Sequence, residues 1–421
     1  MLSSGCVIFC KNSDGKLAST HGFLRVNALG RSSAVKFTTP ALKADIVEHR
    51  TFLSKRNIGL DFLRAILILE GVLYHAARSL PGSNNWYYVA DKNQADIFSA
   101  IIEFIHTFRM EAFFFLSGMF SAMVFARKGA QFFLNNRCKR VLLPLVASFA
   151  FIPGVMYVIT AAIKGEALSL EGVLHGYTYL HHLWFLVSLS AMSFLIPGRW
   201  YNRLAQGMRR LPFPVLVMAL IVACNLFFVV KFLLKDSGEF ISLIPVTARF
   251  AVYYAAGYAL YLNSDKIPQI SQSWLLNNLL VAVLGLISLL AFYVVLHQHI
   301  TSSLKYVPVL ISGVFSVVFS YWLVFTFEKL RMKENALVKG IVDSALVIYI
   351  MHYPLVITGA WLLDDYIPDN LSVTYVFINT LVALCLSTLL YLVIKQFSPL
   401  SVLFGLKPTA KSSSSLANQK G

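Results

Sequence analysis

The chain has 421 residues, of which 57% are hydrophobic and only 13% are charged, whereas about 25% are charged in typical soluble domains. Its formal net charge is nevertheless +16 at pH 7. So little polar surface excludes an ordinary soluble enzyme, and so many apolar residues exclude a disordered chain. The composition predicts an all-α polytopic membrane protein.

The chain begins with a basic stretch that precedes the apolar segments. Residues 1–57 contain no uninterrupted apolar core as long as that of a signal peptide. We expect a poorly ordered, basic N-terminal leader here; a transit peptide and a start assigned too early are the alternatives.

Ten apolar segments follow, and most of them reach the roughly 20 residues that a helix needs to cross a bilayer. Their runs are much longer than barrel strands and show no strand-type alternation, so helices are favoured. The fourth segment is short. We predict a ten-helix membrane domain over 58–397 and a disordered cytoplasmic tail over 398–421. The segments are 58–80, 97–126, 140–163, 182–198, 213–234, 240–262, 274–297, 303–327, 338–363 and 371–395.

The basic residues predict the orientation. If the N-terminus is cytoplasmic, 27 of the 36 Lys and Arg residues fall on the cytoplasmic side, and three, Arg64, Arg109 and Arg249, fall inside segments. This asymmetry is the positive-inside pattern, and an even number of segments places both termini in the cytoplasm. The lipid bilayer therefore explains the charge, and we expect no nucleic-acid partner.

The first apolar segment carries a polar stripe. Ionisable groups inside a membrane are costly and usually face a cavity or a partner. Asp61, Arg64, Ile68, Gly71 and His75 share one face of a helix, with Arg64 and His75 about 16 Å apart along its axis. Asp61 is placed to pair with Arg64. His75 is the candidate base, although a single buried His is often a structural hydrogen-bonding group.

The second segment carries a matching stripe of Glu103, His106 and Arg109, followed by Glu111. If the two helices are antiparallel, Glu103 and His106 lie at a depth similar to that of His75. The alternative is that Arg109 forms a buried ion pair with Glu103 or Glu111 and only holds helices together.

Two later motifs are also polar. His182 and Trp184 open the fourth segment, where Trp184 is also explained as an interfacial aromatic residue. In the ninth segment, Pro354 lacks a backbone N–H and leaves the carbonyl near Ile350 without its helical donor, close to His352. No HExxH or clustered Cys and His spacing occurs, so we expect no metal site.

These patterns resemble the membrane acyltransferase-3 family over residues 58–400. Each motif alone is weak, and together they occur in the order typical of the family. They are Arg64 with ten residues before His75, Phe113 to Gly118 (FFFLSG), Arg137-x-x-Arg140 up to Pro144, His182 to Leu186, and Tyr349-x-x-His352-x-Pro354.

The resemblance implies transfer of an acyl group from cytoplasmic acyl-CoA to a hydroxyl of an extracytoplasmic saccharide, with no tightly bound cofactor. The string from Phe104 to Gly118 is most similar to family members implicated in succinylating periplasmic glucans. It therefore implies succinyl-CoA as donor, a periplasmic glucan or other envelope saccharide as acceptor, the bacterial inner membrane as location, and glucan-synthesis proteins as partners.

The resemblance also assigns roles. It makes His75 catalytic and Arg64 its essential partner. His75 could act as the base for the sugar hydroxyl or could carry the acyl group itself, and both alternatives are open. Glu103 or His106 is placed to orient His75. We expect substrate contacts from Asp61, Arg109, Glu111, Ser117, His182, Trp184 and His352, and contacts to the CoA phosphates from Arg137, Lys139 and Arg140.

Two other classes of function remain. A saccharide transporter would use the same polar stripes to line a pathway, but transporters often show internal repeats and this sequence has none that we detect. A sensor or scaffold would tolerate replacement of His75 and Arg64.

Overall fold

The computed structural model describes residues 8–11, 17–20, 57–81, 86–93, 95–195, 198–234, 239–264, 274–330 and 332–406. The chain divides into two compact units, Met1–Glu48 and His49–Gly421. In the first unit, β1 (Ile8–Lys11) pairs antiparallel with β2 (Leu17–Thr20). The sequence did not predict this hairpin, and the rest of the predicted leader up to residue 56 lies outside the described residues.

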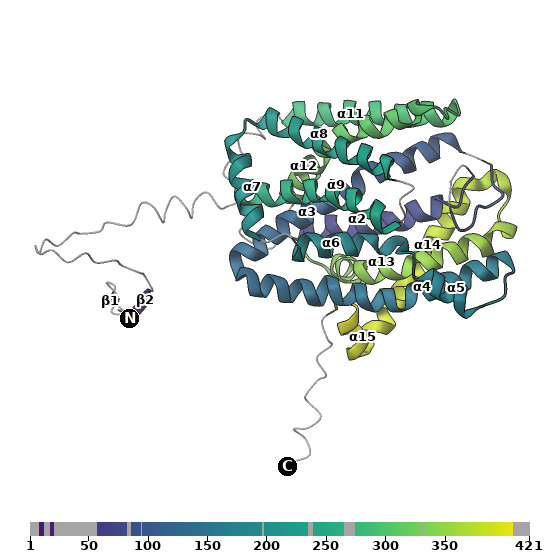
Figure 1. The fold of residues 1–421 in the computed structure, drawn as a ribbon, viewed down its shortest axis with the longest axis horizontal. Coiled ribbons are helices and arrows are strands. Elements are labelled where there is room, and N and C mark those ends of the chain that lie inside the picture. The colour runs from purple at the N-terminus through teal and green to yellow at the C-terminus, as the bar shows by residue number, and fades with distance from the viewer. Residues whose placement is uncertain are drawn as a thin grey trace, which may run out of the picture. The chain divides into compact units, whose positions relative to one another are not determined.

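The described residues of the second unit contain helices and no strand, as predicted for the membrane domain (Figure 1). The longer helices are α2 (Ile58–Ala77), α3 (Asp96–Arg137), α4 (Leu143–Lys164), α6 (Trp184–Phe194), α7 (Gly198–Arg210), α8 (Phe213–Leu233), α9 (Glu239–Leu262), α11 (Trp274–His297), α12 (Val307–Lys329), α13 (Ala336–Leu363) and α14 (Ser372–Gln396). Shorter helical elements are η1 (Cys138–Leu142), α5 (Leu170–Gly176), η2 (His181–Leu183), η4 (Ser303–Tyr306), η5 (Asp364–Tyr366), η6 (Asp369–Leu371) and α15 (Ser398–Leu403).

Every predicted apolar segment coincides with a helix, but fewer of these helices qualify as membrane spans. Among the described residues, five helical segments are long and apolar enough to cross a bilayer, or six if a pair bent by 84° counts as one span. The bent pair includes α6, which has only 11 residues and is too short to cross a bilayer alone. The structure therefore supports a multi-pass membrane protein, and the total of ten spans and the orientation of the termini stay predictions.

One helical segment, Asp96–Lys164, contains two of the predicted spans. A straight helix of its 69 residues would measure about 100 Å, more than three times the thickness of the hydrocarbon core. The segment instead breaks at Gly129, whose φ of +78° is left-handed, and passes through the π-helical turn η1. In Figure 1, α3 leads to the left side of the domain and α4 returns to the right.

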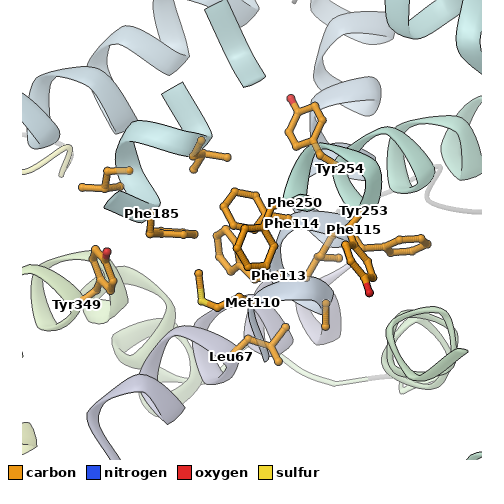
Figure 2. Packing of buried hydrophobic residues seen from close by; sticks show 14 of the residues in the cluster. Leu67, Met110, Phe113, Phe114, Phe115, Phe185, Phe250, Tyr253, Tyr254 and Tyr349 are labelled. Carbon is orange, nitrogen blue, oxygen red and sulfur yellow. The ribbon is translucent and has the colours of Figure 1, made fainter. Parts of the chain in front are cut away.

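The core forms where α3 packs against α9, and glycines permit the close approach. A Cβ atom at Gly118 would overlap the carbonyl oxygen of Tyr254, and one at Gly257 would overlap that of Phe115. Small residues at such crossings let helix backbones approach closely in membrane proteins. Figure 2 shows the aromatic side chains beside this crossing, where the rings of Phe114 and Phe250 stack 4.8 Å apart. This packing explains why the FFFLSG motif ends in glycine.

The predicted disordered tail begins with an ordered helix. In α15, the Ser401 hydroxyl donates a hydrogen bond to the Ile394 carbonyl of α14 at 3.1 Å, and Ser401 is fully buried. The expectation of disorder from residue 398 is therefore wrong for Ser398–Leu403, because these residues form a helix that packs back on α14. Residues 407–421 lie outside the described residues.

Candidate active site

The C-terminal part of the predicted stripe on α2 lines a small internal cavity between α2, α3, α6 and α13. Ile68, Gly71 and His75 come from α2, and Arg109 of α3 and His352 of α13 face them. The cavity holds about 20 Å³, which is room for about one water molecule. Apolar or aromatic side chains complete the wall, namely Leu67, Met110, Phe113, Phe185 and Tyr349. The structure thus brings together His75, Arg109 and His352, which the sequence had placed on three separate helices.

His75 lies inside a cage of aromatic rings. Its imidazole stacks on Trp86 with ring centroids 5.7 Å apart, meets the Tyr353 ring edge-on at 4.9 Å, and lies 5.3 Å from the His352 ring. The Nδ1 atom of His75 is buried, and no group in the described part of the chain hydrogen-bonds to it. A buried nitrogen of this kind is available to a substrate.

His352 is fixed in one tautomer by its own helix. Its Nδ1 lies 2.7 Å from the Tyr349 carbonyl oxygen and 3.2 Å from that of Ile348, so Nδ1 carries the proton and donates it. In the neutral ring, Nε2 is therefore a bare acceptor. This Nε2 is buried and has no hydrogen-bond partner within the described residues.

His182 hydrogen-bonds to the backbone carbonyl that Pro354 leaves without its helical donor. Its Nε2 donates to the Ile350 carbonyl oxygen at 3.1 Å, which is the carbonyl that Pro354 cannot serve. The Tyr349 hydroxyl donates in return to the backbone carbonyl of His182. The carbonyl that was expected to lack its helical donor thus accepts a hydrogen bond from His182. This contact gives the His182 side chain a structural role, whereas the sequence placed it among the substrate contacts.

Arg109 is a buried cation at the cavity wall. Its exposed fraction is 4%, its guanidinium lies over the Tyr74 ring at 5.2 Å, and its Nη1 would lie 2.7 Å from a Cβ atom at Gly71. Its Nε and Nη1 atoms have no hydrogen-bond partner among the described residues. A buried guanidinium with unused donors is suited to an anionic or carbonyl oxygen ligand.

Glu103 and Glu111 of α3 form ion pairs with arginines other than Arg109. The Glu111 carboxylate lies 2.6 Å from the Arg249 guanidinium of α9, and both side chains are largely buried. The Glu103 carboxylate lies 3.7 Å from Arg78. Glu111, predicted to bind substrate, thus joins α3 to α9, and the sequence did not identify Arg249 as its partner.

His106 and Arg64 flank the cavity rather than line it. The His106 ring stacks on Tyr74 with centroids 4.0 Å apart. Arg64 lies 3.9 Å from Asp61, as the stripe predicted, and over the Phe120 ring at 5.3 Å. Among the described ring contacts, the imidazole beside His75 is that of His352.

Two further predicted substrate residues belong to the core. Ser117 is buried next to Gly118 at the crossing of α3 and α9, where its carbonyl accepts a hydrogen bond from Ser121. Trp184 stacks on Phe250 with centroids 5.6 Å apart. Both residues lie outside the lining of the cavity.

The basic loop separates into two environments. Arg137 turns inward, donates to the Ser121 hydroxyl at 2.5 Å and lies over the Phe133 ring. Lys139 and Arg140 are exposed on η1. Of the three residues predicted to contact donor phosphates, these two are exposed at the surface, whereas Arg137 packs inside the turn between α3 and α4.

The 86–93 loop covers His75 and is tied to the connection after α13. The Tyr87 hydroxyl lies 2.6 Å from His181 Nδ1, and the Tyr88 hydroxyl donates to Asp364 at 2.5 Å. The Lys92 ammonium is buried against the carboxylates of Asp364 and Asp369. Burial lowers the pKa of Lys92, but these contacts outweigh it and raise the pKa overall; the pKa of Tyr88 is also raised, by burial and by Asp364.

Sequence reasoning missed the ring contacts of Tyr353 and Tyr74, because aromatic residues are common throughout this chain. Within the described residues, no group of three or more His, Cys, Asp or Glu side chains is arranged to hold a metal ion.

A helical membrane domain that buries an imidazole and a guanidinium around one cavity has the groups that an integral membrane acyltransferase needs. The family model described as an acyltransferase domain, acyltransferase 3, matches residues 57–392. The chain therefore belongs to the acyltransferase-3 family and is an acyltransferase.

Curated relatives agree with this family. Proteins named Glucans biosynthesis protein C from Escherichia coli strain K12 and from E. coli O81 strain ED1a are each 25% identical to the chain over 341 residues. Each alignment covers 75% of this chain and 86% of the relative. No solved structure matches the chain.

Proposed function

We propose that the protein transfers an acyl group, in particular succinyl, from cytoplasmic acyl-CoA to a hydroxyl of an extracytoplasmic glucan or related saccharide. Membership of the acyltransferase-3 family supports the transfer, and the names of the E. coli relatives support a glucan as acceptor. The inner membrane of a bacterium is the location that fits such relatives.

The observation that carries this proposal is the unpartnered, buried Nδ1 atom of His75 in a cavity that also presents the free donors of Arg109. Acyl transfer needs a base for the attacking hydroxyl and a donor for the oxyanion that develops on the carbonyl. Neutral imidazole is suited to the first task near pH 7.

The saccharide hydroxyl oxygen attacks the thioester carbonyl carbon, and His75 accepts the hydroxyl proton as the new C–O bond forms. The C–S bond then breaks, and the imidazolium returns the proton to the leaving thiolate. The products are a saccharide ester and free CoA.

Basic residues suit the charged parts of the donor. Arg109 suits the free carboxylate of a succinyl group, because a planar guanidinium binds a carboxylate through two parallel hydrogen bonds. The exposed Lys139 and Arg140 suit the CoA phosphates. The cavity holds about one water molecule, so the acyl chain enters only if the surrounding side chains move apart.

The test uses membranes that contain the protein, radiolabelled succinyl-CoA and periplasmic glucan. We expect labelled glucan from the wild type and from His175→Ala, a matched control at an exposed histidine of α5, and none from His75→Ala at equal protein level. Full activity of His75→Ala would refute the assignment of the base.

Two further readouts separate the alternatives. Label that remains on the protein after an acid quench would indicate that His75 carries the acyl group itself. Movement of unmodified glucan across the membrane without any labelled product would indicate a transporter instead.

A further inference from the structure

His75 and His352 come from different helices and face each other across the cavity. Their ring centroids are 5.3 Å apart and their planes are tilted by 36°. This separation lets two facing ring nitrogens approach within hydrogen-bonding distance after a small rotation of either side chain. His352 is only 1% exposed, so the ring next to His75 is shielded from solvent.

The protonation of the His352 ring is set by the backbone of α13. Two carbonyl oxygens, those of Tyr349 and Ile348, accept from Nδ1, and a carbonyl oxygen cannot donate. The neutral ring therefore offers only a lone pair at Nε2. A buried acceptor without a donor is costly, which favours any N–H that reaches it.

The groups around His352 leave His75 as the ring best placed to supply that N–H. His182 of η2 directs its Nε2 to Ile350, so its proton is already used. Arg109 of α3 lies across the same cavity and is the competing donor. An Arg109 engaged with the acyl donor leaves the His352 acceptor to His75.

We propose that His352 is the positioning residue for His75: its Nε2 accepts the N–H of the His75 ring and so fixes the tautomer in which the other nitrogen takes the hydroxyl proton. This inference rests on the proposed function and names the group that orients the base. The same task falls to a buried carboxylate in serine hydrolases, where it holds the imidazole and stabilises the imidazolium.

A pair of variants separates this role from a merely structural one. In His352→Asn, the side-chain amide stands where Nδ1 stood and keeps the donor to the helix carbonyl, but the acceptor at Nε2 is lost. In His352→Gln, an amide oxygen reaches the Nε2 position and restores an acceptor. We expect kcat to fall about 10-fold or more in His352→Asn with KM within about 2-fold, and His352→Gln to recover most of that loss.

The matched controls are His175→Asn and His175→Gln on α5, which should both retain wild-type kcat. A structural role would make the asparagine variant at least as active as the glutamine variant, because only asparagine keeps the helix contact. That order, or equal wild-type activity in both variants, would overturn the proposal.

A second measurement does not depend on turnover. Nitrogen-15 NMR of histidine-labelled protein should show one imidazole protonated at Nδ1 and bare at Nε2 whose signal disappears in His352→Gln. A proton on Nε2 of His352 would overturn the inference even if acyl transfer is confirmed. If the wild type transfers no acyl group, the proposed function fails, and the NMR result still decides the geometry.

Discussion

His182 donates a hydrogen bond to the carbonyl oxygen of Ile350 at 3.1 Å, and this carbonyl is the one that Pro354 leaves without a helical N–H. A break in one helix is thus filled by a side chain from another element. The same contact fixes the tautomer of His182 and joins η2 to α13 beside the cavity.

This relationship predicts a coupled pair of substitutions. His182→Ala should lower the free energy of unfolding by about 1–3 kcal/mol, because it leaves a buried carbonyl unpaired. Pro354→Ala restores an N–H that can serve Ile350, so His182→Ala should cost less in that background. Thermal unfolding of the four proteins in detergent gives the coupling, and equal costs in both backgrounds would contradict it.

The ion pair between Glu111 and Arg249 predicts a large penalty for a single replacement. Glu111→Ala leaves the Arg249 cation buried without its partner at 2.6 Å, which should cost about 3–5 kcal/mol. The double variant Glu111→Leu with Arg249→Met removes both charges and should recover much of that loss. Denaturant or thermal unfolding compares the wild type with the two variants, and a double variant less stable than Glu111→Ala would disprove a structural role for the pair.

The crossing of α3 and α9 predicts intolerance of a single methyl group. Gly118→Ala and Gly257→Ala each force a Cβ atom into a backbone carbonyl oxygen, so the helices must separate and the folded yield in detergent should fall sharply. Gly340→Ala on α13 is the control, because its Cβ meets nothing within 4 Å. Size-exclusion profiles of the three variants test this, and wild-type behaviour of Gly118→Ala would show that the crossing can relax.

The Lys92 contacts predict a pH dependence of stability. The pKa of Lys92 is raised above its ordinary 10.5 by Asp364 and Asp369, so its stabilising contribution is fully present below pH 10.5 and is lost as the pH rises through the raised value. The difference in unfolding temperature between wild type and Lys92→Met should stay constant from about pH 6 to pH 9 and shrink only in stronger alkali. A difference that shrinks below pH 9 would contradict the shift.

The buried Arg109 predicts acyl selectivity. Arg109→Gln removes the charge that suits the free carboxylate of a succinyl group, and a lost charge-assisted contact costs about 1.5–3 kcal/mol, or roughly 10- to 100-fold in kcat/KM. Transfer of an acetyl group, which has no carboxylate, should fall much less. Parallel assays with succinyl-CoA and acetyl-CoA measure the ratio, and an equal loss for both donors would assign Arg109 to the thioester oxygen instead.

The sequence by itself determined the class of protein, the helical segments and the shared face of Ile68, Gly71 and His75. These features are local: apolar length sets the segments, and a fixed rotation per residue sets the face. The sequence also predicted that the carbonyl near Ile350 lacks its helical donor, because proline has no backbone N–H.

The tertiary structure alone decided which side chains meet. Glu111 was near Arg109 in sequence but pairs with Arg249, and His75 was near His106 in depth but faces His352. The ordered helix α15 and the inward turn of Arg137 were likewise not evident from the sequence. Such choices depend on how helices distant in the chain pack. The close approach at Gly118 and the hydrogen bonds of His182 and His352 fix positions that periodicity leaves open.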